Sequence, residues 1–134
     1  MSTRAHIRIQ DGDEHLMLYH HSDGMPEGIG KDLRRFLANQ CKDGYWDVEE
    51  IANALIKGAV KYWRKGIWSG KPELHTDDGY EVTTSLHGDE EYIYVIDCES
   101  KSIKCYTHKM DYPYHLSVVP ENEVEIPEPK AEEA

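Results

Sequence analysis

Two short segments of the sequence concentrate side chains that could do chemistry, one at 20–28 and one at 87–90. Their histidines, acidic residues and one serine are His20, His21, Ser22, Asp23, Glu27, His87, Asp89 and Glu90. Imidazole nitrogens and carboxylate oxygens bind divalent metals and also serve as general acids and bases. If the two segments meet in the fold, we predict that these eight residues form a ligand- or partner-binding site.

A metal-dependent enzyme is one possibility, and its metal ligands would be His21, Asp23, His87 and Asp89. The spacing is unspecific, because no histidine pair lies at i, i+4 on a helix as in the H-E-x-x-H motif. His21, Ser22 and Asp23 also have the residue types of a hydrolytic triad. Sequence neighbours rarely take that geometry, however, and no G-x-S-x-G elbow is present. The sequence therefore favours a non-enzymatic protein, with no catalytic residue, metal or cofactor assigned.

The glycine-rich segment at 20–30 is expected to join a strand to a helix, and such a junction can hold an anion at the helix N-terminus. A small-ligand protein, of a nucleotide-binding or sponge type, is therefore an alternative function. The glycines do not match the G-x-x-x-x-G-K-[ST] or G-x-G-x-x-G motifs, and no Lys or Arg precedes Lys31 in the segment. A turn shaped by Pro26 and the glycines is the simpler interpretation.

The charge of the chain points to a basic protein partner. The formal net charge is −11, and a field of that sign repels nucleic-acid backbones and attracts basic surfaces. Tyr and Trp, which often anchor protein interfaces, are frequent around the second predicted helix, at Tyr45, Trp46, Tyr62, Trp63 and Trp68. We expect binding to a protein with a basic surface, without direct nucleic-acid or membrane binding; the oligomeric state is left open.

The cysteines and the N-terminal segment predict a cytoplasmic protein. Cys41, Cys98 and Cys105 are odd in number and form no C-x-x-C pair, so neither a disulfide framework nor a cysteine-rich zinc site is expected. The chain has no apolar run near the ~20 residues that span a membrane. The first residues also lack the apolar stretch of a signal peptide.

The hydrophobic pattern predicts an α+β domain over residues 1–119 with the element order β-β-α-α-β-β-β. The expected strands cover 5–10, 15–19, 80–86, 92–96 and 103–107, and the expected helices cover 29–40 and 47–65. Hairpin-type strand groups favour an antiparallel sheet of about five strands with both helices packed on one face. Residues 120–134 hold three prolines and a net charge of −5, and they are expected to form a disordered acidic tail.

The segment Tyr19–Gly28 contains the stretch His-Ser-Asp-Gly-x-Pro-Glu-Gly. It resembles a stretch that follows an N-terminal hairpin in small proteins encoded by bacteriophages, prophages and other mobile elements. Residues 51–56 and 87–92 are similar to the same group, and the resemblance covers about residues 5–108. It implies an accessory protein of the host-cell cytoplasm that inhibits a host defence factor, as anti-CRISPR proteins do. It assigns no catalytic residue.

Overall fold

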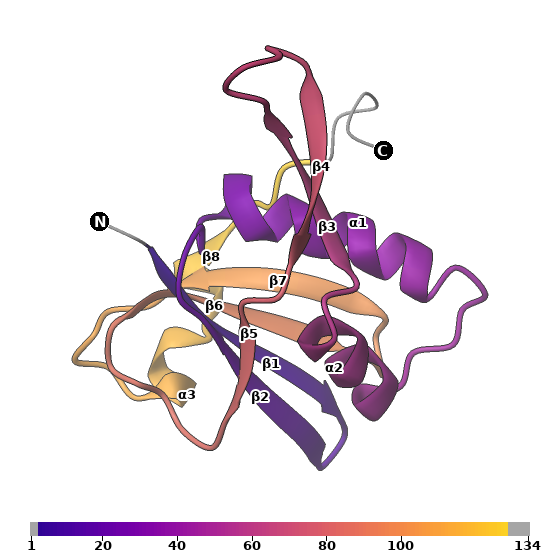
Figure 1. Cartoon of the computed structure of the whole chain (residues 1–134). Helices are drawn as coiled ribbons and strands as arrows, with labels where there is room; N and C mark the ends of the chain where they lie inside the picture. Colours follow the sequence, from indigo (N-terminus) through magenta and orange to yellow (C-terminus); the bar gives the residue numbers. More distant parts are fainter. Residues whose placement is uncertain (1–2, 129–134) are drawn as a thin grey trace.

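The computed structural model describes residues 3–128, and its centre is a six-stranded sheet in the order β5-β2-β1-β6-β7-β8 (Figure 1). The strands are β1 (Arg4–Asp11), β2 (Glu14–His20), β5 (Tyr80–Thr83), β6 (Glu90–Asp97), β7 (Ser102–Thr107) and β8 (Glu123–Val124). The central pair β1–β6 is parallel, while the other neighbouring pairs are antiparallel. The α+β class is confirmed. The expected five-stranded antiparallel sheet is wrong, because β6 returns beside β1 after a long connection, which a parallel pair requires.

Two helices, α1 (Lys31–Gln40) and α2 (Val48–Ile56), cover one face of the sheet. Strand residues point alternately to the two faces, and those buried with the helices include Ala5, Ile7, Ile9, Leu18, Tyr94 and Ile96. The packing of these two helices on one face is confirmed. As the capping pattern predicts, the Asp47 side chain accepts a hydrogen bond of 2.9 Å from the Glu50 N–H at the start of α2.

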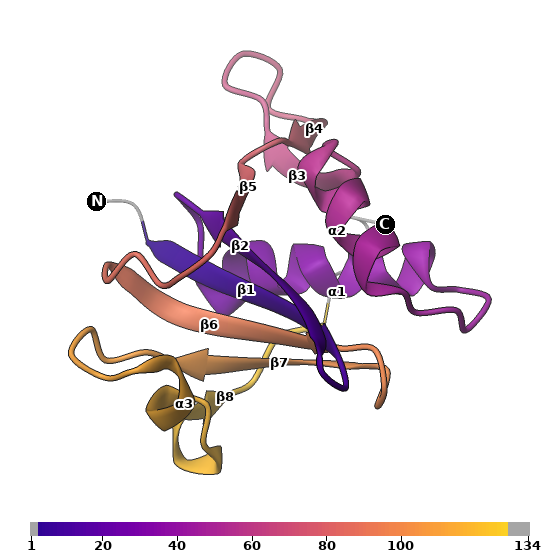
Figure 2. The same ribbon diagram turned by 90° about the horizontal axis from the view of Figure 1, so that it is seen from below.

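The opposite face of the sheet carries a smaller apolar cluster beside the short helix α3 (Tyr114–Ser117) (Figure 2). Its buried residues are Ile93, Val95 and Tyr106, with Tyr114 and Val118 packed against them. The sequence did not predict α3. Within residues 3–128, no helix is long and apolar enough to cross a membrane.

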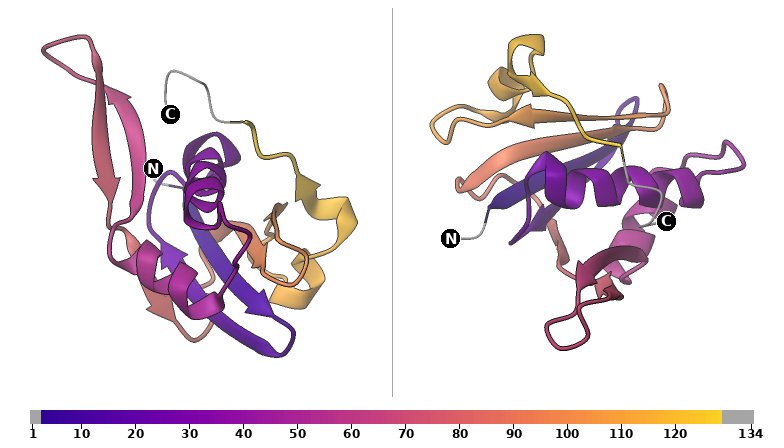
Figure 3. Two further views of the ribbon diagram at one scale, coloured as in Figure 1. Left: turned by 90° about the vertical axis from the view of Figure 1, so that its right-hand side faces the viewer. Right: turned by 90° about the horizontal axis from the view of Figure 1, so that it is seen from above.

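The second predicted helix is shorter than expected, because α2 ends at Ile56 rather than near Lys65. Gly58 takes φ of +83°, a left-handed conformation that ends helices, and the Ala59 N–H closes the last turn on the Ala54 carbonyl at 2.9 Å. Residues Val60–Lys65 then form β3, which pairs with β4 (Pro72–Asp77) in a separate two-stranded sheet. This hairpin projects from the body of the molecule (Figures 1 and 3).

The C-terminal segment continues to pack on the sheet beyond residue 119, where the folded domain was expected to end. After a 3-10 turn at Pro120–Asn122, β8 pairs with β7 at Cys105 and Tyr106. Ile126 is buried in the core, and the Arg34 guanidinium donates a hydrogen bond of 3.0 Å to its carbonyl. The expected start of the disordered tail at 120 is therefore wrong for residues 120–128. Residues 129–134 lie outside the described residues.

Ile126→Val is expected to lower the free energy of unfolding by about 1 kcal/mol, because one buried methyl group is lost from the core. Urea denaturation monitored by circular dichroism measures the change. Glu125→Gln changes an exposed neighbour and serves as the control. Equal stability of the Ile126 variant and wild type would show that this segment does not pack on the core in solution.

All three cysteines are buried and free, as expected for reduced thiols. Burial raises the pKa of both Cys98 and Cys105 to about 12. Since the thiolate is the reactive form, burial lowers the reactivity of the Cys98 and Cys105 thiols.

Candidate functional site

The structure divides the eight predicted site residues between the two faces of the sheet. Tyr19 and His20 are neighbours on β2, so their side chains point to opposite faces. His20 lies on the helix face, where its ring contacts Tyr80 of the core at 4.5 Å between centroids. The helix face carries His20, Ser22, Asp23 and Glu27. The other four predicted residues are grouped around Tyr19, namely His21, His87, Asp89 and Glu90.

Around Tyr19, the 20–28 and 87–90 segments do meet. The His87 ring stacks on the Tyr19 ring at 3.8 Å, and the His21 ring contacts it edge-on at 4.8 Å. The Tyr19 hydroxyl donates to the Asp89 carboxylate at 2.9 Å, and burial together with this bond raises the pKa of Tyr19 to about 12. Burial opposes ionisation of Asp89, but Tyr19 and the Arg4 guanidinium outweigh it and lower the pKa of Asp89.

Glu90 organises the second segment from inside the protein. Its side chain is fully buried, and its two carboxylate oxygens accept the N–H groups of His87 and Gly88, each at 2.8 Å. His6 is also fully buried beside it, with its Nδ1 3.8 Å from the nearer oxygen. Glu90 therefore shapes the 87–90 turn, and it is not accessible to a partner.

The proposed metal ligands do not form one site. Asp23 lines a cleft on the helix side of the sheet, whereas His21, His87 and Asp89 surround Tyr19. His21 is bound to Glu81, with 2.6 Å between Nε2 and the carboxylate oxygen. Among residues 3–128, no group of three or more His, Cys, Asp or Glu side chains could hold a metal ion.

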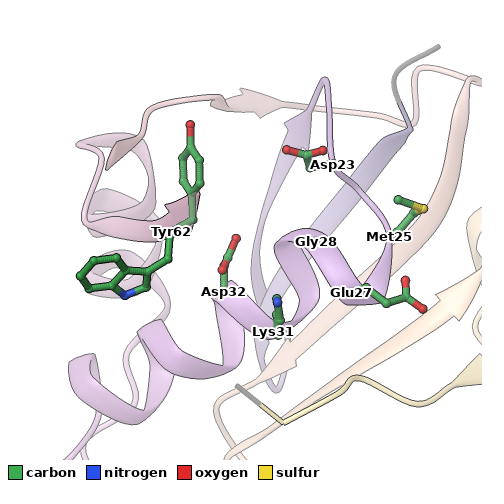
Figure 4. A pocket seen from close by; sticks show the side chains of 8 residues that line it. Asp23, Met25, Glu27, Gly28, Lys31, Asp32 and Tyr62 are labelled. Atoms are coloured by element: carbon green, nitrogen blue, oxygen red, sulfur yellow. The ribbon is translucent and has the colours of Figure 1, made fainter. Parts of the chain in front are cut away.

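On the helix side, a cleft of about 270 Å³ lies between the start of α1 and the β3–β4 hairpin (Figure 4). We call it the acidic cleft; it is lined by Asp23, Met25, Glu27, Gly28, Lys31, Asp32, Tyr62 and Trp63. In Figure 4 the Asp32 carboxylate points into the space between Tyr62 and Asp23. The lining thus includes three carboxylates, two aromatic rings and the cationic side chain of Lys31.

A smaller hollow of about 50 Å³ adjoins the acidic cleft, with which it shares Asp23, Asp32 and Tyr62. In its wall the His20 Nε2 lies 2.8 Å from a carboxylate oxygen of Asp77. The Ser22 N–H donates to His20 Nδ1 at 3.4 Å, so Nδ1 is the acceptor and Nε2 carries the proton. Burial alone would raise the pKa of Asp77, but the bonds from His20 and the Gly79 N–H hold it below its ordinary value.

Asp32 gives the acidic cleft a titratable charge near neutral pH. Burial raises the pKa of Asp32 to about 6, although the nearby positive charges of Arg35 and Lys31 lower it. The Arg35 guanidinium lies 3.3 Å from the carboxylate. A cation entering the cleft would further favour the ionised carboxylate, so binding of a cation is expected to release a proton near pH 6.

The shape of the cleft depends on the turn that joins β2 to α1. Asp23 takes a positive φ of 54°, and its carbonyl accepts the Ile29 N–H at 2.8 Å. Residues Pro26–Gly30 then form a π-helical turn that leads into α1. A Cβ on Gly28 would lie only 2.4 Å from the Asp23 carbonyl oxygen. The glycine-rich segment is therefore a shaped turn that leaves no room for a side chain at Gly28.

Gly28→Ala is expected to lower the free energy of unfolding by about 1–2 kcal/mol, because the added methyl group forces the backbone of the turn apart. The same shift moves Asp23 relative to the cleft. Thermal unfolding measures the loss, with Met25→Ala as a control in the same turn, since Met25 is 43% exposed. Wild-type stability of the Gly28 variant would contradict the tight approach.

Asp32 and Asp77 were not among the predicted site residues, and Tyr62 and Trp63 were named as interface aromatics but not placed beside the 20–28 segment. Tyr62 and Trp63 were assigned to a continuous helix that in fact ends before them. Asp77 lies 57 positions from its partner His20. The alternation of side chains along β2 was a signal that could have been used, because it sends His20 and His21 to opposite faces of the sheet.

Comparison of the chain with protein-family models, with curated proteins and with solved structures found no match. The α+β fold and the acidic cleft are therefore the basis for the functional argument.

Proposed function

We propose that the chain is a non-enzymatic, phage-type accessory binding protein that inhibits a host defence factor by binding a basic surface on that protein. The observation that carries this proposal is the acidic cleft, which is lined by the carboxylates of Asp23, Glu27 and Asp32 and by the aromatic rings of Tyr62 and Trp63. Carboxylates pair with Lys and Arg, and aromatic faces attract the same cations. The resemblance of residues 19–28 to proteins of mobile elements supports the phage setting.

A single cationic side chain of a partner would fit the acidic cleft, whose volume is about 270 Å³. A Lys or Arg side chain of a partner would fill it as an anchor, in the way that buried anchors carry most of an interface's energy. The carboxylates disfavour the anionic ligand that the glycine-rich segment had suggested.

The β3–β4 hairpin extends this surface beyond the cleft. The same hairpin that supplies Tyr62 and Trp63 has Ile67 and Trp68 at its tip, which are 92% and 98% exposed. Large apolar side chains with that exposure are typical of interaction surfaces when they cluster. A partner that places a cation in the acidic cleft would gain apolar contact from this tip.

Asp32→Asn tests the electrostatic part of the proposal. The variant is expected to weaken partner binding about tenfold, because it removes a charge that is partly shielded from water. Tagged protein is used to recover partners from lysate of a defence-bearing host, at low and at high salt. Asp13→Asn makes the same charge change on an exposed hairpin turn and is expected to bind as wild type does.

The pH dependence provides an independent check with the recovered partner. Because the pKa of Asp32 is about 6, binding is expected to weaken as the pH falls from 7.5 through 6, and Asp32→Asn should remove this dependence. Inhibition itself is read as plaque formation by a defence-sensitive phage on cells that express the chain. Equal recovery with Asp32→Asn and Asp13→Asn, or binding that ignores salt, would contradict the proposal.

A further inference from the structure

A second cavity lies away from the acidic cleft, where the later part of α1 faces the loop before α2 and the start of β7. Its volume is about 350 Å³, and it is lined by Arg34, Leu37, Ala38, Trp46, Lys101, Ser102 and Ile103. We propose that this cavity, which we call the basic pocket, binds a small anion that carries a flat aromatic ring. This inference rests on residues that the proposed function does not use.

The charge of the basic pocket is opposite to that of the chain. No carboxylate among residues 3–128 lines it, although the protein carries a net charge of −11. Lys101 makes no hydrogen bond or ion pair with any residue in the part of the chain that the structure describes. Arg34 is paired with Glu128 at 2.5 Å, but the Glu128 side chain is 78% exposed, and ion pairs of that kind contribute little. An incoming anion can therefore displace Glu128 and engage both cations.

The backbone places Lys101 over the pocket at some conformational cost. Lys101 takes φ of 55°, a left-handed conformation that favours glycine or asparagine. Its Nζ reaches across to the loop before α2, since a Cβ on Gly44 would lie 3.8 Å from it. Within the described part of the chain, β8 pairs with β7 at Cys105 and Tyr106 alone. Ser102 and Ile103 thus lie on a stretch of the sheet edge that no described strand covers, with backbone polar groups available to a ligand.

The remaining wall of the basic pocket is apolar and aromatic. Trp46 supplies an indole, and Leu37 and Ile103 supply aliphatic surface. Aromatic rings stack on such surfaces with a gain beyond simple burial. The volume lies within the usual range for small-molecule sites, ~300–1,000 Å³. One anionic group near Lys101 and Arg34, with a ring against Trp46, satisfies both halves of the pocket.

Titration of the full chain by two-dimensional ¹H–¹⁵N NMR tests the proposal, with AMP and benzoate as the phosphate and carboxylate probes. At least one of them is expected to shift the Trp46 indole N–H resonance and to reach saturation. Lys101→Gly should weaken binding about tenfold, which corresponds to about 1.4 kcal/mol, while glycine suits the positive φ and keeps the fold. Glu128→Gln should strengthen binding, because it removes the competing carboxylate.

Matched controls separate a built pocket from general attraction to charge. Lys104→Ala removes an exposed lysine three residues along β7, whose side chain points to the other face of the sheet, and should leave the affinity unchanged. Adenosine lacks the anion, and inorganic phosphate lacks the ring. Each should therefore bind more weakly than AMP, by about tenfold in affinity or more. The proposal is overturned if neither AMP nor benzoate saturates the shift of the Trp46 resonance by about 10 mM. It is also overturned if Lys101→Gly and Lys104→Ala change the affinity equally, or if inorganic phosphate binds as tightly as AMP.

Discussion

Leu55→Ala is expected to lower the free energy of unfolding by about 2–5 kcal/mol. Leu55 is fully buried near the end of α2 and belongs to the core cluster that also contains Leu18 and Val60. Truncation removes apolar area from the core and leaves a cavity, because packed neighbours relax only partly. The loss is a large share of the ~5–15 kcal/mol that usually stabilises a domain.

Ile56→Ala is the matched control for this prediction. Ile56 is the next residue on α2 but is 38% exposed, so its truncation should destabilise the protein by less than half as much. Urea denaturation of both variants, with equal slopes, gives the two losses on one scale. Similar losses for Leu55 and Ile56 would show that α2 packs against the sheet in a different rotation.

The strong local signals of the sequence predicted most of the elements. The alternation in β1 and β2 and the cap at Asp47 depend on neighbours within a few residues, and the structure agrees with them. The end of α2 was not predicted, because Val60 and Trp63 fit both a helical spacing and a strand rich in β-formers. Gly58 was the available signal, since glycine with positive φ ends helices.

Long-range pairing is what the sequence could not reveal. The parallel contact between β1 and β6 joins segments more than 80 residues apart, and no local pattern specifies it. The His20–Asp77 pair and the burial of Ile126 depend on the same kind of contact. Composition suggested a disordered tail because it counts prolines and charges, whereas one buried isoleucine and one strand pair fix residues 120–128.

A buried histidine on the α3 side of the sheet is expected to lower the stability of the protein at acidic pH. His6 is fully buried, and neither ring nitrogen has a hydrogen-bond partner among residues 3–128. Burial lowers the pKa of His6 to about 4; Glu90 opposes this effect, and Arg8, His108 and His87 add to it. His6 is therefore neutral at pH 7, and its 3.8 Å approach to Glu90 is neither an ion pair nor a hydrogen bond at that pH.

The sign of the effect follows from proton counting. Between pH 6.5 and 4 the unfolded chain binds a proton at His6 and the folded chain does not, so stability falls as the pH falls through this range. The full shift in the pKa of His6 corresponds to a loss on the order of 3 kcal/mol in the free energy of unfolding. Asp32 acts in the opposite direction, because its raised pKa of about 6 makes the folded state bind a proton first. The wild-type curve alone therefore understates the contribution of His6.

Comparison with His6→Gln isolates that contribution, because glutamine does not titrate. We expect the wild-type free energy of unfolding, minus that of the variant, to decrease by about 3 kcal/mol between pH 7 and pH 4. His15→Gln changes an exposed histidine on β2 and should show no such difference. Asp77 and Asp89 have lowered pKa values, so their contributions are lost only below about pH 4 and do not overlap this window. A difference that stays constant with pH would mean that His6 is hydrated or paired in solution, and that the α3 face of the sheet is open to water.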